Sequence, residues 1–217
     1  GAIAHHVVSE PGVSWGDEIE NPVIILAAGA SSRMKKAEGF SESTTEEVTT
    51  RPKAMLRVGK DNTPFLDLLI RRIQSEGSNC VIVVIGEHDK ITRKYFEENP
   101  IYEVEIRFVV QTIPTDRSKP LGTSQAVQIA LENNRDLQCH SIVVCNGDNM
   151  PPANSFSEIF KDPCAMLAYD SSALNLPDDR VSAFAIVSVT EDGKLDEIIE
   201  KPNKELIPSF VQSDGVL

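Results

Sequence analysis

Apolar residues occur along this chain in short, nearly continuous runs that are separated by stretches with helical periodicity. Such runs are typical of strands in a sheet that is covered on both faces. On this basis we expect strands that begin at Val23, Cys80, Val104 and Ser141. Strands that alternate with helices predict an α/β fold whose sheet is mainly parallel, with right-handed crossovers.

The intervening segments carry helix signals. Residues 64–76 place apolar side chains on one face, and we expect Thr63 to cap this helix and Gly77 to end it. Other apolar patterns follow along the chain. They predict helices at 89–98, 123–133 and 155–160 and strands at 165–169, 183–189 and 195–199.

Two polar stretches interrupt this organisation. Residues 1–21 show no core-forming pattern, and we expect them to be a lead-in or linker. Residues 38–50 are polar and contain four acidic residues, which predicts a mobile loop. We therefore expect one core over residues 22–217. Because residues 213–217 resemble the beginning of a further strand, we expect this core to be truncated at its C-terminus.

Composition and charge narrow the classes of partner. The formal net charge is -12, with 33 acidic against 21 basic residues and no basic run, so we expect no nucleic-acid partner. We also expect no membrane partner, because no apolar run approaches the ~20 residues that a spanning helix needs. The four cysteines lack CxxC spacing and fit buried thiols in a reducing cytoplasm. The negative net charge does not exclude a phosphate site, because an anion is held by a few local groups and not by the overall charge of the protein.

The segment LAAGASSRM, residues 26–34, carries the first candidate chemistry. A predicted strand runs into a turn of small residues, which would let backbone N–H groups approach an anion. Arg33 adds a cation whose planar fork suits phosphate. The segment is neither a Walker A loop nor GxGxxG. On these residues alone, a phosphate-binding loop and a tight turn with an exposed arginine are equally open.

Further motifs follow in a fixed order. They are RPKAML at 51–56, Gln111 followed by PLGTSQA at 120–126, NGDN at 146–149 and EKP at 200–202. With LAAGASSRM, they resemble the motifs of the sugar-1-phosphate nucleotidyltransferases, also called sugar-nucleotide pyrophosphorylases. The resemblance covers residues 23–202 and implies a Rossmann-like fold, with a mixed, mainly parallel sheet flanked by helices.

The resemblance also implies an activity. Such an enzyme transfers a nucleoside monophosphate from a nucleoside triphosphate to a sugar 1-phosphate, releases pyrophosphate and forms an NDP-sugar. Its ligands would be the nucleoside triphosphate and the sugar 1-phosphate, and its cofactor would be Mg²⁺. Members of the family often oligomerise, so a homo-oligomer stays open.

Roles for individual residues follow from the same resemblance. Arg33 would hold the triphosphate, Lys53 would contact the α-phosphate, and Lys201 would meet the sugar phosphate. Asp148 would bind Mg²⁺, a hard cation that prefers carboxylate oxygen. The nucleotide-binding residues would be Leu26, Ala27, Gly29, Gln111, Gly122 and Thr123, with Gln111 and Gly122 facing the base.

The chain departs from the family pattern in two places. The spacer at 34–52 is long and acidic, and Lys35, Lys36 and Arg51 are equal candidates for a second basic group. The family's second metal-binding Asp has no good match, since Asp214 fits poorly. Two alternatives therefore stay open. One is a cytidylyltransferase that acts on an alcohol phosphate or a cofactor-precursor phosphate, and the other is a non-catalytic nucleotide-binding regulatory homologue.

Overall fold

The computed structural model describes residues 7–8, 18–29, 52–117, 120–169 and 184–200. The chain divides into two compact units, Gly1–Pro163 and Cys164–Leu217, and each is described by itself. The polar stretch predicted to be a mobile loop at 38–50 lies outside the described residues. In the ranges described, no helix is both long enough and apolar enough to cross a membrane.

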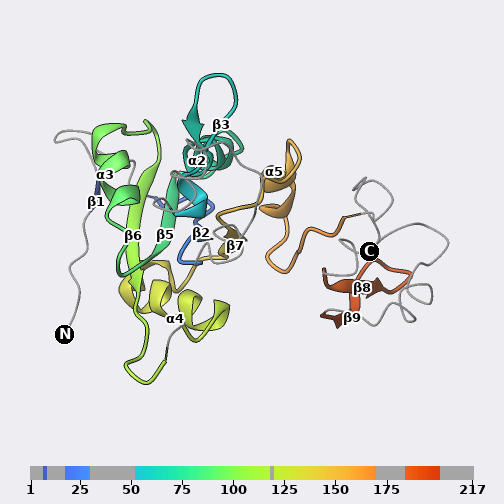
Figure 1. Ribbon diagram of the computed structural model, residues 1–217. Helices are drawn as coiled ribbons and strands as arrows, with labels where there is room; N and C mark the ends of the chain where they lie inside the picture. The colour runs from blue at the N-terminus through green and yellow to red at the C-terminus, as the bar shows by residue number, and fades with distance from the viewer. Residues whose placement is uncertain (1–6, 9–17, 30–51, 118–119, 170–183, 201–217) are drawn as a thin grey trace. The chain divides into compact units, whose positions relative to one another are not determined.

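The first unit contains a five-stranded sheet with the strand order β1-β6-β5-β2-β7 (Figure 1). Strands β2, β5, β6 and β7 run parallel, whereas β1 is antiparallel to β6. The mixed, mainly parallel sheet predicted from the sequence is therefore confirmed. The strands are β1 (Val7–Val8), β2 (Val23–Leu26), β5 (Cys80–Gly86), β6 (Glu105–Gln111) and β7 (Val143–Asn146).

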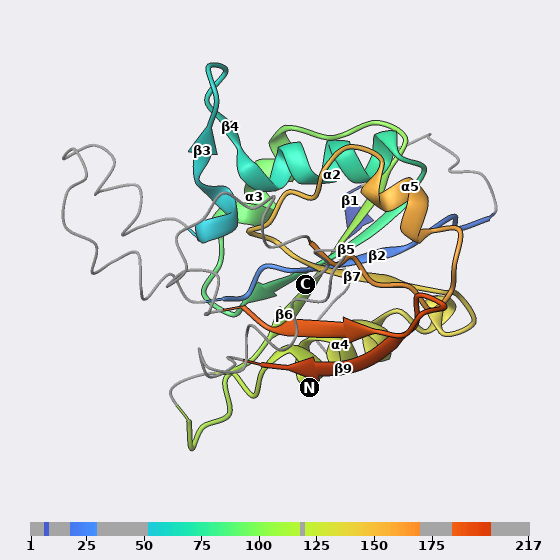
Figure 2. The ribbon, with the colours of Figure 1, turned by 90° about the vertical axis from the view of Figure 1, so that its right-hand side faces the viewer.

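Helices cover both faces of this sheet (Figure 2). Helices α2 (Phe65–Ser75), α3 (Ile91–Glu98) and α5 (Ser155–Ile159) lie on one face, and α4 (Thr123–Asn133) lies on the other. Alternate strand residues serve the two faces. Ile25 and Val83 pack with α2, while Ile24 and Val84 pack with Ala126 and Ala130 of α4. This double burial explains why the strands are continuous apolar runs.

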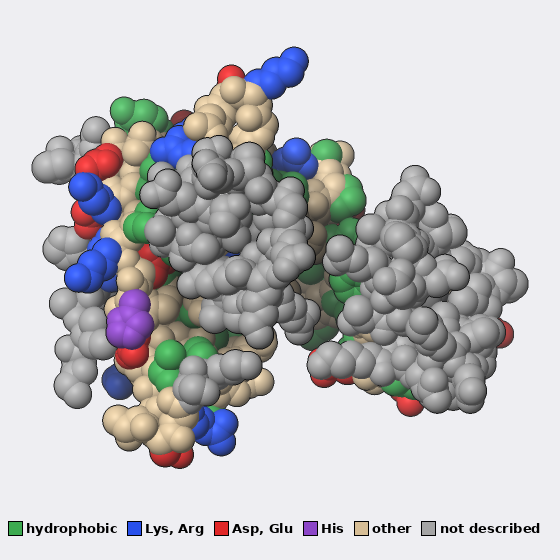
Figure 3. Space-filling view, viewed as in Figure 1, with side chains coloured by type: hydrophobic (Ala, Val, Ile, Leu, Met, Phe, Trp, Pro, Cys, Tyr) green, Lys and Arg blue, Asp and Glu red, His purple; other side chains and the backbone are tan. Residues whose placement is uncertain are grey.

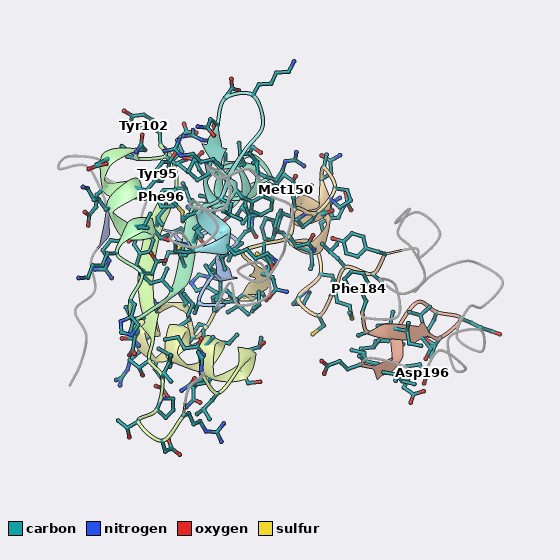
Figure 4. The ribbon with its side chains drawn as sticks, viewed as in Figure 1. Tyr95, Phe96, Tyr102, Met150, Phe184 and Asp196 are labelled. Carbon is teal, nitrogen blue, oxygen red and sulfur yellow. The ribbon has the colours of Figure 1, made fainter. Side chains whose placement is uncertain are left out.

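Helices α2 and α3 are joined by a buried carboxylate. Asp67 of α2 is 1% exposed and accepts hydrogen bonds from Arg71 Nε (2.6 Å) and from the hydroxyl of Tyr95 on α3 (3.0 Å). Figure 4 shows Tyr95 beside Phe96, whose ring is fully buried. Burial, together with the charge of Asp67, raises the pKa of Tyr95. The hydrogen bond between Asp67 and Tyr95 therefore links the two helices on this face of the sheet.

A second carboxylate joins α2 to α5. Glu76, the residue after α2, accepts hydrogen bonds from the backbone N–H groups of Asn154 (3.0 Å), Phe156 (2.8 Å) and Ser157 (3.3 Å). The N–H groups in the first turn of a helix have no partner within the helix. A side chain about 80 positions earlier in the sequence thus caps α5.

Two expectations about single elements differ from the structure. Thr63 does not cap α2. Instead, Thr63–Pro64 forms strand β4, which pairs with β3 (Arg57–Val58), and α2 begins at Phe65. Thr63 pairs with Val58 in this small hairpin, and the residue before the helix is Pro64, which makes no side-chain cap hydrogen bond. Residues 165–169, predicted to be a strand, are irregular. Gly77 does follow the end of α2, as expected.

The ends of the described chain add further differences. Val7–Val8, within the predicted lead-in, form β1. In the second unit the predicted strands are confirmed: β8 (Ile186–Val189) lies within the strand predicted at 183–189, β9 (Leu195–Ile199) has the predicted bounds, and the two form an antiparallel pair. The expectation of buried thiols is correct only in part. Burial raises the pKa of Cys80 and of Cys145 to about 12, whereas Cys139 and Cys164 are exposed.

Candidate active site

The carboxyl ends of the parallel strands meet at one edge of the sheet, which we call the carboxyl edge. Leu26 of β2 is in register with Val84 of β5 and with Asn146 of β7. Just beyond the strands, Ala27 N donates to Val84 O (2.9 Å) and Gly147 N donates to Leu26 O (2.9 Å). Ligands of parallel α/β sheets bind outside this edge. The structure therefore brings Leu26, Ala27 and the Gly147 turn together there.

Lys53 reaches this region from a short helical turn. The 3₁₀ helix η2 (Lys53–Met55) buries Ala54 and Met55 in the core cluster that also contains α2. Met55 N donates to Pro52 O (2.9 Å), which closes the turn. Because its two neighbours point into the core, Lys53 points outward and its side chain is 45% exposed.

Lys53 and Asp148, which lie 95 positions apart, form an ion pair in the structure. The distance from Lys53 Nζ to Asp148 Oδ2 is 2.6 Å, and the two side chains are 45% and 42% exposed. Exposed ion pairs contribute little to stability, typically about 0–1 kcal/mol. The pair is therefore expected to contribute little to the stability of the fold, and both side chains are accessible to solvent.

Close packing fixes the turn that carries Asp148. A Cβ atom at Gly147 would lie 3.2 Å from Ala27 Cβ and 3.2 Å from Leu26 O, so a larger residue would require these neighbours to shift by a few tenths of an ångström. On the other side of Asp148, Met150 packs against the core cluster beneath α2 (Figure 4). Asp148 thus stands on an exposed turn between two anchored positions.

The second part of the site joins β6 to α4. Gln111 is the last residue of β6, is 4% exposed and donates from Nε2 to Gly122 O (3.0 Å). Gly122 has φ 120° and ψ -166°, a conformation that favours glycine. Thr123, the first residue of α4, is exposed. Gln111 and Gly122, both assigned to the base by the resemblance, are therefore in direct contact.

Sequence reasoning assigned no role to Gln125, although the residue lies in the motif that contains Gly122. Gln125 Oε1 accepts hydrogen bonds from Gln111 Nε2 (3.0 Å) and from Leu121 N (3.2 Å). The available signal was its position in the first turn of a helix, where a side-chain acceptor can reach back to a backbone N–H. That signal does not identify Gln111 as the second partner.

The remaining predicted residues are placed as follows. Gly29 is exposed and is the last described residue after β2. Arg33 and Lys201 lie outside the described residues, as do Lys35, Lys36, Arg51 and Asp214. The roles that the resemblance implies for all the site residues stay predictions.

Asp148 can be tested for its fit to a hard cation. No group of three or more His, Cys, Asp and Glu side chains in the described ranges could hold a metal ion. Mg²⁺, however, is usually held by one or two carboxylates together with substrate phosphates. A single, half-exposed carboxylate beside a lysine fits that arrangement.

The space-filling view (Figure 3) shows how charged side chains are distributed over one face of the molecule. On the face shown in Figure 3, the described lysine and arginine side chains are separated from one another and interspersed with acidic ones.

Comparisons with known proteins agree with the motif order. Residues 23–215 match the model of the family described as Nucleotidyl transferase. The chain is similar to the bifunctional protein GlmU of Methanococcus maripaludis strain C7, with 29% identity over 194 residues, which is 89% of this chain and 38% of the relative. The GlmU protein of Methanococcus vannielii is 28% identical over 192 residues, 88% of this chain and 38% of the relative. The chain thus spans well under half the length of these relatives.

Solved structures share the fold. UTP-bound UGPase from Acinetobacter baumannii has a TM-score of 0.56 and 17% identity, over 85% of this chain and 69% of that one. HddC from Yersinia pseudotuberculosis, complexed with GMP-PN, has a TM-score of 0.52 and 22% identity, over 84% of this chain and 70% of that one.

Proposed function

Since this chain belongs to the nucleotidyl transferase family, we propose that it transfers a nucleoside monophosphate from a nucleoside triphosphate to a sugar 1-phosphate. The reaction releases pyrophosphate and forms an NDP-sugar. The observation that carries the proposal is the ion pair between Lys53 and Asp148 at the carboxyl edge. It joins a cation suited to phosphate with a carboxylate suited to Mg²⁺, in a region where such sheets bind ligands.

The proposed chemistry is an in-line displacement at phosphorus. An oxygen of the sugar 1-phosphate forms a bond to the α-phosphorus, and the bond from that phosphorus to the oxygen that bridges it to the β-phosphate breaks. The electron pair of the broken bond leaves with pyrophosphate. Both substrates are anions, so positioning and neutralisation of charge supply most of the rate enhancement.

Each residue has a part in this scheme. Lys53 contacts the α-phosphate and stabilises the negative charge that moves there in the transition state. Asp148 holds Mg²⁺, which when bound offsets the charge of the triphosphate. Gln111 and Gly122 receive the base, and Leu26, Ala27, Gly29 and Thr123 line the nucleotide. Arg33 is proposed to stabilise the departing pyrophosphate, and Lys201 to bind the sugar phosphate.

The choice of a sugar phosphate rests on the EKP motif at 200–202 and on what the family resemblance implies for it. Two solved neighbours are a UGPase and a glucose-1-phosphate thymidylyltransferase whose activity is inferred, with TM-scores of 0.56 and 0.55. Their identity to this chain is 17%, so they support the fold, and the sugar substrate is part of the proposal.

The test is a pyrophosphate-release assay with each of the common nucleoside triphosphates against a panel of sugar 1-phosphates and Mg²⁺. We expect release that requires both substrates, and we expect the NDP-sugar to be identified by mass spectrometry. Release with an alcohol phosphate and CTP in place of the sugar would support a cytidylyltransferase. Tight nucleotide binding without release from any acceptor would support a non-catalytic homologue.

A matched control separates specific catalysis from contamination. Lys60 lies in the exposed turn of the β3–β4 hairpin, seven positions after Lys53. Lys60→Ala should keep the full rate of pyrophosphate release, whereas Lys53→Ala should lose it. Equal rates in both variants would show that the measured activity does not come from this site.

A further inference from the structure

The side-chain amide of Gln111 is held by two acceptors at once. Its Nε2 donates to Gly122 O (3.0 Å) and to Gln125 Oε1 (3.0 Å), and the residue is 4% exposed. An amide nitrogen carries two hydrogens. These two hydrogen bonds therefore use the full donor capacity of Gln111.

Neighbouring backbone groups determine where the oxygen and the nitrogen of the Gln111 and Gln125 side-chain amides lie. Gly122 O is a carbonyl and can only accept, so the atom of Gln111 that faces it must be the NH₂ group. Leu121 N can only donate, so the atom of Gln125 that faces it (3.2 Å) must be the carbonyl oxygen. The hydrogen-bond network therefore determines the orientation of both side-chain amides.

The Gln111 side chain can therefore form a hydrogen bond with a ligand only as an acceptor. With both hydrogens engaged, the side chain can offer its carbonyl oxygen, Oε1, which accepts hydrogen bonds. A ligand atom that also carries a lone pair would stand against this oxygen without a hydrogen between them. Such opposed, buried acceptors cost binding energy, and sites built on buried polar groups reject ligands on that basis.

We propose that Gln125 is a positioning residue that holds Gln111 as a hydrogen-bond acceptor and so selects bases with a ring N–H. Uracil, thymine and guanine present a ring N–H on the edge opposite the sugar. Cytosine and adenine present a ring nitrogen with a lone pair at the corresponding place. This inference rests on the proposed function, because it assumes that the base of the nucleoside triphosphate lies at Gln111.

The first test compares uridine and cytidine triphosphates as substrates and as ligands of the full chain. The two bases differ at N3, which carries a hydrogen in uracil and a lone pair in cytosine, and at C4, which carries an oxygen in uracil and an amino group in cytosine. We expect UTP to exceed CTP in kcat/KM and in affinity measured by calorimetry. Gln125→Met removes the acceptor at similar side-chain length, which frees one Nε2 hydrogen of Gln111. The UTP-to-CTP ratio should then fall by about tenfold, the effect of one hydrogen bond of about 1.4 kcal/mol.

Two matched variants act as controls. Gln125→Glu keeps a carboxylate oxygen that accepts from Leu121 N and Gln111 Nε2, so the UTP-to-CTP ratio should stay within about twofold of the original. Gln128→Met makes the same change one turn later on α4, where Gln128 contacts Glu132 (2.8 Å), and it should leave the ratio unchanged. A role limited to folding would change stability in Gln125→Met without changing the ratio.

A second measurement needs no variant. Uridine triphosphate methylated at N3 lacks the ring N–H, and it should bind the unaltered chain at least about tenfold more weakly than UTP. Equal binding of the two ligands would overturn the inference. So would a preference of the unaltered chain for CTP or ATP, or an unchanged UTP-to-CTP ratio in a folded Gln125→Met variant.

The outcomes also distinguish this inference from the proposed function. If nucleoside triphosphates bind with the expected preference but no pyrophosphate is released, the selection of the base stands and the proposed transfer fails. If pyrophosphate is released equally from UTP and CTP, the transfer stands and the selection fails. If no triphosphate binds, both fail.

Discussion

Backbone hydrogen bonds join neighbouring segments at both ends of the central sheet, but the charged side chains at the two ends differ in their exposure. At the amino ends of the strands, neighbouring segments bond to one another. Asn79 Oδ1 accepts from Glu20 N (2.8 Å), Asn79 N donates to Glu20 O (3.2 Å), and Glu105 N donates to Asn79 O (2.8 Å). At the carboxyl edge, the Lys53–Asp148 pair is nearly half exposed.

Arg107 strengthens the amino end further. Its guanidinium donates to Glu105 (2.8 Å) and to Asp136 (2.7 Å), which lies in the 3₁₀ helix η3 (Arg135–Leu137), and its side chain is 16% exposed. Burial alone would lower the pKa of Arg107, but the hydrogen bonds to Glu105 and Asp136 raise it above its ordinary value. The Arg107 side chain is only 16% exposed between its acidic partners, whereas the paired Lys53 and Asp148 side chains at the carboxyl edge are 45% and 42% exposed.

If the proposed function is correct, the sheet divides stability and chemistry between its two ends. Substitutions at the carboxyl edge should lower activity and leave unfolding nearly unchanged. Substitutions at the amino end should do the reverse. Four substitutions test this division, two at each end.

The largest effect is expected for Lys53→Ala. Loss of a single group that stabilises charge in the transition state typically lowers kcat by about a hundredfold or more. The melting temperature should hardly change, because exposed ion pairs contribute little to stability. Steady-state kinetics and thermal unfolding measure the two quantities. A large drop in melting temperature together with the loss of kcat would contradict the division.

At the opposite end, Arg107→Met should destabilise the fold by about 2 kcal/mol. Removing one member of a fully buried ion pair costs more, about 3–5 kcal/mol, but Asp136 is half exposed and can be hydrated. Arg107 Nε is also buried without a partner among the described residues, and the substitution relieves that cost. Urea unfolding measures the change, with the exposed Arg117→Met as control. Normal stability would show that the network is not structural.

Asp148→Asn should weaken the response to Mg²⁺. Loss of a supporting group around a metal typically costs 10–100-fold in affinity, so replacing a proposed ligand by an amide should raise the Mg²⁺ midpoint by at least about tenfold. Activity titrated against Mg²⁺ gives the midpoint, with Asp61→Asn at the exposed hairpin turn as control. An unchanged midpoint would mean that Asp148 does not hold the ion.

The smallest effect is expected for Glu76→Ala. Loss of the cap on α5 should lower the free energy of unfolding by about 1 kcal/mol, the usual worth of a helix cap. Glu76→Gln keeps an oxygen acceptor for the N–H groups of α5 and should lose less. Chemical denaturation of both variants measures this difference. Equal losses would mean that the charge of Glu76 matters more than its hydrogen bonds.

The sequence predicted the core elements well because their signals are local. The start of β2 at Val23, the start of β5 at Cys80 and the whole of α4 were predicted correctly. Thr63 was assigned to the wrong element because a threonine before a helix is a good cap unless a neighbouring segment pairs with it. Val7–Val8 was missed because two residues carry too little pattern to predict a strand.

The candidate site was predictable in its parts but not in its contacts. The resemblance assigned the α-phosphate to Lys53 and Mg²⁺ to Asp148, yet the contact between these residues depends on how η2 packs over the core. The link from Gln111 to Gln125 depends likewise on where β6 ends relative to α4. Contacts of this kind come from three-dimensional packing, and periodicity along the chain does not encode them.

The absence of a side chain at Gly147 lets the turn that carries Asp148 pack closely against β2. A methyl group there meets Ala27 Cβ and Leu26 O, both at 3.2 Å, so those neighbours must give way by a few tenths of an ångström. Gly147→Ala leaves the Asp148 side chain itself unchanged and alters only the packing of the turn that carries it. The variant would therefore test the packing of this turn separately from the charge of the Asp148 carboxylate.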